Sequence, residues 1–163
     1  MFDELKAVQT QLHGAIFDDT REYRYVLWRR WAEGPMLAYI GLNPSTADEI
    51  VNDPTVTRCI NFAKREGMSG MFMLNAFALR STDPKALYTH KSPIGHMNDA
   101  YLKFVSSMSS MTIACWGVHG AWLGRGVHIA SRLPGLKCFG TTKEGHPRHP
   151  LYLPSNCKIF PFN

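Results

Sequence analysis

Polar side chains that can recognise a ligand or move a proton follow four apolar runs of the sequence. Amides can orient a water molecule or read a hydrogen-bonding edge, and imidazole and carboxyl groups can transfer protons. A set this rich in amides, imidazoles and cations is typical of an active site rather than of a packed interior. The side chains are Asn43, Asp48, Asn75, Arg80, His119, Lys143, His146, Arg148 and His149.

The apolar runs determine where those side chains meet. Continuous apolar runs without a polar face are typical of strands buried on both faces of a parallel sheet. Ligands bind outside the carboxyl ends of such strands, so we expect the side chains that follow the runs to share one rim. The runs span residues 36–42, 70–77, 111–116 and 136–139.

Helices are expected between these strands. Two of these helices are expected to begin after Asp53 and Asp83, each of which is followed by proline. Aspartate is a favourable N-cap, and proline is favourable at the first helical position. Further helices are expected over residues 98–108 and 121–133. The alternation predicts an α/β fold, a three-layer α/β/α sandwich around a mainly parallel four-stranded sheet, in a single domain over residues 1–163.

Two segments outside these runs also have strand patterns. Residues 22–31 alternate as a half-exposed strand with aromatic and basic faces, a chemistry that also suits contacts with nucleic acid. Residues 157–160 are expected to form a short last strand.

Each chemical signal also has a purely structural interpretation. Asn43 precedes a proline, and this pair of residues is typical of a turn. Asn75 lies inside an apolar run, where either the backbone or a ligand can meet its hydrogen bonds, and Trp116 can be a core aromatic or a stacking surface. His146 and His149 lie close together and could bind a metal, but no third ligand has suitable spacing, so no metal is expected.

The composition is that of a mildly basic globular protein. The chain has 163 residues, 45% hydrophobic and 19% charged, with a net charge of +5. This excludes a disordered or acidic protein and permits a polyanionic partner without requiring one. The cysteines are dispersed, and neither a signal segment nor a membrane-length apolar run is present. We expect a reduced, cytoplasmic protein with no membrane association, no cofactor and no obligate protein partner.

Several segments together resemble a bacterial and phage family of unknown function, the DUF family numbered sixteen forty-three. The resemblance spans about residues 14–160, and the number of motifs in order makes it specific, although it implies no activity. The segments are Gly41–Asp48, Asp53–Thr55, Arg58–Cys59, Asn75–Ala78, Thr82–Pro84, Asn98–Asp99, Trp116–Gly120 and Pro147–Leu153.

More remotely, the same segments are similar to the uracil-DNA glycosylase superfamily, which implies that superfamily's fold and the hydrolysis of an N-glycosidic bond. Gly41–Pro44 matches its first motif, and the resemblance gives Asn43 the role of positioning the attacking water. Leu74–Ala76 matches the motif whose amide reads the base edge, which makes Asn75 the base reader. Trp116, followed by glycine, matches the motif that ends the third strand.

The last superfamily motif, His-Pro-Ser-Pro-Leu, is similar to a string here that is one residue longer. The resemblance makes His146 or His149 the group that stabilises the departing base, and Leu151 the side chain that wedges into the duplex. Phe77 or Trp116 would stack on the base.

The first motif departs from the superfamily's aspartate form, because Asn43 cannot act as a base and carries no negative charge. Asp48 is a nearby carboxylate that can compensate, whereas Asp53 is interpreted as a helix cap. The side chains expected to hold phosphates are Arg80, Lys143 and Arg148.

The favoured hypothesis is a uracil-DNA-glycosylase-like hydrolase that acts on a base in nucleic acid or in a nucleotide. The alternative is a non-catalytic module that binds a nucleotide or nucleic acid on the same fold, which Asn43 and the longer last loop favour. A third hypothesis is a metal-dependent hydrolase that uses His146, His149 and an acidic residue.

Overall fold

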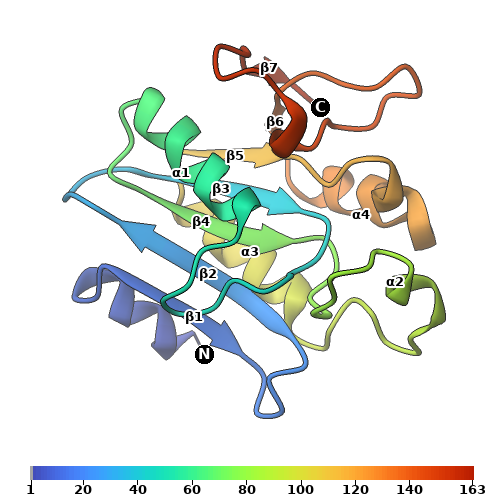
Figure 1. The fold of residues 1–163 in the computed structure, drawn as a ribbon, viewed down its shortest axis with the longest axis horizontal. Helices are drawn as coiled ribbons and strands as arrows, with labels where there is room; N and C mark the ends of the chain where they lie inside the picture. Colours follow the sequence, from blue (N-terminus) through green and yellow to red (C-terminus); the bar gives the residue numbers. More distant parts are fainter. Residues whose placement is uncertain (1) are drawn as a thin grey trace.

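A single seven-stranded sheet forms the centre of the molecule (Figure 1). The computed structural model describes residues 2–163, and the strands follow the order β1-β2-β4-β3-β5-β6-β7 across the sheet. Strands β3, β4, β5 and β6 are parallel to one another, whereas the pairs β1–β2, β2–β4 and β6–β7 are antiparallel. The strands are β1 His13–Phe17, β2 Arg24–Arg30, β3 Met36–Gly41, β4 Gly70–Asn75, β5 Met111–Ala114, β6 Lys137–Cys138 and β7 Phe160–Pro161.

Helices cover both faces of this sheet, with α1 on the near side of Figure 1 and α3 on the far side. Val56 and Phe62 of α1 join one apolar core, and Leu102 and Val105 of α3 join the other. The predicted α/β class is therefore confirmed. The helical elements are η1 Asp3–Gln9, α1 Pro54–Arg65, α2 Ala86–Thr89, α3 Asn98–Met108, η2 Val118–Gly124, α4 Arg125–Arg132 and η3 Pro150–Tyr152.

The start of α1 has the predicted cap. The Asp53 carboxylate accepts a hydrogen bond of 2.8 Å from the backbone N–H of Val56, and Pro54 occupies the first helical position. The first backbone N–H groups of a helix have no partner within it; the carboxylate binds one of them, and proline has none to satisfy. Within residues 2–163, no helix is long and apolar enough to cross a membrane.

The prediction of a four-stranded sheet is wrong. Four strands do form a parallel core, but β1 and β2 extend it beyond β4, and β7 pairs antiparallel with β6. The last strand is Phe160–Pro161, later than the expected residues 157–160. The sequence pattern does not predict β1, and it does not show that the strands predicted over residues 22–31 and 157–160 extend the same sheet. A strand pattern does not encode which neighbour a strand pairs with or in which direction.

The strand predicted over residues 22–31 forms as β2, but the prediction that it is half-exposed is wrong. Strand β2 is buried along nearly its whole length, and Arg24 and Arg29 are only 2% and 7% exposed. The guanidinium of Arg29 donates to the backbone carbonyls of Asp48, at 2.7 Å, and Val51, at 3.2 Å. These cations are buried because loop carbonyls, which the sequence pattern does not reveal, accept their hydrogen bonds.

The helix expected over residues 121–133 is shorter. It divides into η2 and α4, because Trp122 has an extended ψ of 134° and Leu123 a left-handed φ of 56°. The indole of Trp116 occupies the neighbouring space, and a Cβ at Gly120 would lie 2.0 Å from its ring. The helix therefore breaks where the chain packs against this indole. Hydrophobic periodicity does not reveal such a break.

Candidate functional site

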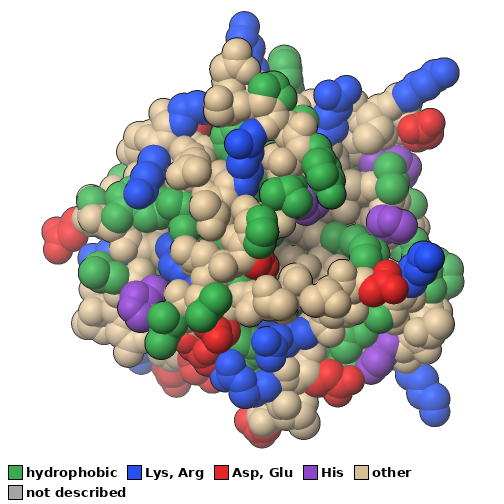
Figure 2. Space-filling view, in the orientation of Figure 1, with side chains coloured by type: hydrophobic (Ala, Val, Ile, Leu, Met, Phe, Trp, Pro, Cys, Tyr) green, Lys and Arg blue, Asp and Glu red, His purple; other side chains and the backbone are tan. Residues whose placement is uncertain are grey.

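A cavity of about 410 Å³ opens at the carboxyl edge of the parallel strands. Strand β3 lies between β4 and β5, so the chain crosses to opposite sides of β3 in turn, and such a switch point is where open parallel sheets bind ligands. Figure 2 shows a hollow near the middle of this face, bordered by hydrophobic and histidine side chains. The polar lining comprises Arg24, Asn43, Ser45, Asp53, Thr55, Asn75, Ser81, Thr82, His119, His149 and Tyr152.

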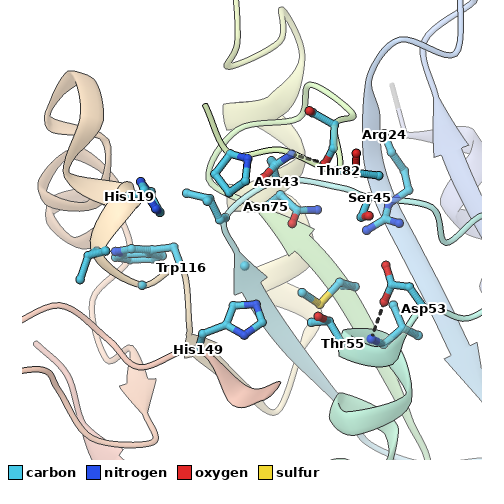
Figure 3. Close-up of a pocket in the computed structure, with 18 of the residues that line it drawn as sticks. Arg24, Asn43, Ser45, Asp53, Thr55, Asn75, Thr82, Trp116, His119 and His149 are labelled. Atoms are coloured by element: carbon cyan, nitrogen blue, oxygen red, sulfur yellow. Dashed lines mark hydrogen bonds between the residues drawn. The ribbon is translucent and has the colours of Figure 1, made fainter. Parts of the chain in front are cut away.

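Asn75, the last residue of β4, places a buried amide at the wall of this cavity (Figure 3). The residue is 1% exposed, and its Nδ2 has no hydrogen-bond partner among the residues that the structure describes. Its backbone carbonyl is occupied, because it accepts a 2.9 Å bond from Nδ2 of the buried Asn98. An unpaired buried amide costs about 1–3 kcal/mol, and a ligand in the cavity could supply the missing hydrogen bond.

Asn43 follows β3 and has a different hydrogen-bond environment. Its Nδ2 donates to the backbone carbonyls of Ser81 at 3.0 Å, Pro44 at 3.2 Å and Leu79 at 3.3 Å. The amide thus ties the loop after β3 to the segment after β4. Since the nitrogen is committed to the backbone, the oxygen of the amide is the atom available to orient a water molecule.

His149 lies in the loop before η3 and also lines the cavity. Its Nδ1 accepts a 3.2 Å hydrogen bond from the backbone N–H of Leu151, so the neutral ring carries its proton on Nε2. Burial lowers the pKa of His149 below its ordinary value of 6.5, opposed by the nearby negative charge of Asp53. At neutral pH this side chain is therefore an uncharged Nε2–H donor.

Asp53 and Arg24 bring opposite charges to the same cavity (Figure 3). Asp53 caps α1 through Oδ1, which leaves Oδ2 for the cavity. Arg24 donates from Nη1 to the carbonyl of Ala47 at 2.9 Å, but its Nε has no partner within residues 2–163. Burial lowers the pKa of Arg24 to about 10, with Asp53 the first of the charges that oppose the shift, so the guanidinium stays cationic at neutral pH.

The mouth of the cavity carries more exposed side chains. Tyr152 is 85% exposed and Val118 is 50% exposed, and both line the opening. In η2, Nδ1 of His119 forms a 2.7 Å hydrogen bond with the hydroxyl of Tyr88, and this bond links η2 to α2. The opening is thus bordered by apolar, aromatic and imidazole groups.

The cavity brings together five of the side chains that the sequence singled out, with His119 at its mouth. Asn43, Asn75 and His149 line it directly. Trp116 lines it as well but is 2% exposed and packs edge-on against Phe162, so it is mainly a core aromatic.

The other acid–base and stacking candidates lie elsewhere. The Asp48 carboxylate accepts bonds from the N–H groups of Ile50 and Val51, which shape its own loop and lower its pKa. His146 lines a separate cavity behind Trp116. Phe77 is fully buried in the core on the α3 side.

The expected phosphate contacts and the expected wedge do not line the cavity either. The guanidinium of Arg80 lies over the Phe17 ring and donates to the Arg21 carbonyl, and Arg148 donates to the Thr141 carbonyl. Lys143 is exposed on the loop after β6, and Leu151 is half-buried in η3.

Two charged side chains of the cavity were missed or given only a structural role. The sequence pattern places Arg24 on a half-exposed strand, but β2 runs antiparallel to β4 and so brings its amino end to the carboxyl edge of the parallel core. Asp53 was interpreted as a cap, and it both caps α1 and lines the cavity. An N-cap at the rim of a parallel sheet was the one available signal for Asp53.

The residues that the structure describes contain no group of three His, Cys, Asp or Glu side chains placed to hold a metal. His146 and His149, the pair that could have formed such a group, line different cavities. The geometry therefore does not favour the metal-dependent hydrolase.

Comparison with known proteins gives one match. The family model described as "Protein of unknown function (DUF1643)" matches residues 24–151, which include every polar residue that lines the cavity except Tyr152. No curated protein and no solved structure matches the chain.

Proposed function

We propose, for a chain that belongs to the DUF1643 family, that the cavity hydrolyses the N-glycosidic bond of a base in a nucleotide or nucleic acid. One observation carries the proposal: Asn75, whose buried Nδ2 has no partner among the described residues, lines the same cavity as Asn43 and His149. A carboxamide offers one donor and one acceptor side by side, which is the complement of the carbonyl and ring N–H of a pyrimidine edge.

The other polar groups can divide the reaction between them. Water, oriented by Oδ1 of Asn43, attacks C1′ of the sugar while Asp53 accepts its proton and later releases it to solvent. The C1′–N bond breaks, and its electron pair leaves with the base. The Nε2–H of His149 stabilises that charge by a hydrogen bond, and the base then takes a proton from solvent. The new hydroxyl stays on C1′.

The arrangement of the motifs supports this proposal. The segments that are similar to the uracil-DNA glycosylase superfamily follow β3, end β4 and follow β5 and β6, and all four of these strands are parallel. Asp53 replaces Asp48 as the proposed carboxylate, because Asp53 lines the cavity and Asp48 does not. Between the two candidate histidines, the same criterion selects His149.

A base-release assay tests the proposal. The substrates are single- and double-stranded oligonucleotides that carry uracil, hydroxymethyluracil or hypoxanthine, together with the matching nucleoside monophosphates. We expect release by the unsubstituted protein and a loss of about 100-fold or more in Asp53→Asn and His149→Ala. His146→Ala should retain release, as should His96→Ala, an exposed histidine outside the cavity. Absence of release from every substrate would contradict the proposal.

A non-catalytic binding module remains the second candidate function. The observation that favours it is the commitment of the Asn43 amide to three backbone carbonyls, because this gives the residue a structural role without any chemistry. This candidate predicts nucleotide affinity that depends on Asn75, without release of free base.

A further inference from the structure

Arg24 is the least compensated charge in the cavity. It is 2% exposed, yet only its bond from Nη1 to the Ala47 carbonyl is met, and its Nε has no partner within residues 2–163. No carboxylate of the described residues forms an ion pair with it, Asp53 included. A buried cation with unfilled donors at the wall of a cavity is a group that a ligand anion would complete.

The surroundings of Arg24 suit an oxyanion. Figure 3 shows its guanidinium beside Ser45, on the side of the cavity where α1 begins. That helix has 12 residues, and its amino end presents Thr55 to the cavity. A helix N-terminus carries partial positive charge, and the hydroxyls of Ser45 and Thr55 can donate to a phosphate oxygen. Asp53 already caps this helix, so a bound anion must lie on the Arg24 side of that carboxylate.

The base-reading amide and the buried cation occupy neighbouring strands. Asn75 ends β4, and Arg24 begins β2, which pairs with β4. The cavity of about 410 Å³ that they share is within the usual range for a small-molecule site. One ligand can therefore present a base to Asn75 and an anionic group to Arg24.

The cavity itself has the cation content for a single phosphate rather than for a polynucleotide backbone. A protein that tracks a nucleic acid backbone lines its groove with several basic side chains. Among the described residues that line this cavity, Arg24 is the sole lysine or arginine. Because Arg24 is buried, the phosphate must enter the cavity, and an internal phosphodiester would need room for the chain to leave on both sides.

We propose that Arg24, with Ser45 and Thr55, forms a subsite for the terminal phosphate of a nucleoside monophosphate, so that the ligand of this cavity is a mononucleotide rather than a base within a strand. This inference rests on the proposed function in one respect, the reading of the base by Asn75. It goes beyond that proposal by naming the substrate class and a residue that recognises it.

Isothermal titration calorimetry with matched probes tests this subsite. The probes are nucleosides of uracil, thymine, cytosine, adenine, guanine and hypoxanthine, their 5′-monophosphates, and trinucleotides without terminal phosphate that carry the same base centrally. For the base that binds most tightly, we expect the monophosphate to bind about tenfold or more tightly than the nucleoside and than the trinucleotide. Equal affinity for nucleoside and monophosphate, or tightest binding of the trinucleotide, would overturn the inference.

Variants then assign the phosphate contact. Arg24→Gln should reduce the ratio between monophosphate and nucleoside affinities to about one, whereas Asn75→Ala should weaken both ligands and keep the ratio. Arg132→Gln, an exposed arginine of α4, is the matched control and should keep the ratio unchanged. If Arg24→Gln does not fold, two other measurements test the phosphate subsite. Thr55→Val should lower the same ratio in part, and the probes are compared on the unsubstituted protein.

The same experiment separates this inference from the proposed function. Hydrolysis produces a continuing heat after the binding heat, so affinity and turnover are read independently. Selective binding of the monophosphate without turnover would support the subsite and contradict the hydrolase. Base release from nucleosides and strands, but not from the monophosphate, would support the hydrolase and overturn the subsite.

Discussion

At the scale of single residues, the amide nitrogen of Asn75 differs from that of a second buried asparagine nearby. Asn98 is fully buried and its Nδ2 donates to the carbonyls of Asn75 and Ala76 at 2.9 and 3.2 Å. The Nδ2 of Asn75 has no such partner among the described residues. A structural amide and the proposed ligand-binding amide thus lie side by side, and substitution should distinguish their roles.

We expect Asn75→Leu to leave the free energy of unfolding within about 1 kcal/mol of that of the unsubstituted protein, because an unpaired buried amide is replaced by an apolar group. Nucleotide binding should be lost. Asn98→Leu is the matched control and should cost about 1–3 kcal/mol, since it removes two buried hydrogen bonds, to the carbonyls of Asn75 and Ala76. Of these two carbonyls, that of Ala76 keeps its bond from Nε of Arg125. Urea denaturation gives the stabilities. An equal loss in both variants would show that Asn75 is structural.

The Asp53 side chain both caps α1 and lines the cavity, and two substitutions distinguish these roles. Asn is as good an N-cap as Asp, so Asp53→Asn should keep the stability but lose the negative charge and the base release. Asp53→Ala should lose release and also about 1 kcal/mol of stability. Thermal denaturation and the base-release assay are compared for both variants. Full activity of Asp53→Asn would exclude a role for the carboxylate.

The depressed pKa of His149 predicts a pH dependence of stability. Because the folded-state pKa lies below the unfolded value of about 6.5, the unfolded chain binds more protons between the two values. The contribution of His149 is therefore fully present above about pH 6.5 and is lost as the pH falls through the folded-state pKa. Urea denaturation across this range, with His149→Gln as reference, measures the difference. A stability that instead falls with rising pH would contradict this expectation.

At the scale of elements, one buried side chain holds the loop between β3 and α1. Arg29 of β2 donates to the carbonyls of Asp48, Glu49 and Val51 and to the side chain of Asn52. This loop ends at the cap that lines the cavity. The strand therefore positions the loop without contributing Arg29 itself to the cavity lining.

We expect Arg29→Met to loosen this loop while the sheet persists. The loss of hydrogen bonds from a charged group should cost about 2 kcal/mol of stability. Amide hydrogen exchange should accelerate over residues 47–52, and nucleotide affinity should fall because Ser45 and Asp53 are no longer fixed. Arg30→Met, which removes bonds to η1 instead, is the matched control. Unchanged exchange over residues 47–52 would contradict this role of Arg29.

At the scale of the whole molecule, one continuous sheet joins the two ends of the chain. The expectation of a single domain therefore predicts a single cooperative unfolding transition. Trp28 and Trp116 contribute to the buried core and should report fluorescence changes at the same urea concentration as far-ultraviolet circular dichroism. A separate early transition of the first two strands would show that β1 and β2 fold independently of the parallel core.

The local chemistry of the chain was readable from its sequence. Apolar runs predicted the parallel strands, because burial on both faces removes polar residues from them. The Asp53 cap was predicted because its hydrogen bond spans only three residues. Asn43, Asn75 and His149 were selected because each follows or ends a predicted strand and the carboxyl ends of parallel strands share one edge.

Tertiary structure alone decided which groups complete the cavity. The antiparallel direction of β2 brings Arg24 to the carboxyl edge, whereas local hydrogen bonds keep Asp48 in its own loop. His146 and His149 are close in sequence but line different cavities, because the loop passes beside Trp116 between them. Strand direction and loop path depend on contacts between residues far apart in the chain, which a local sequence pattern does not encode.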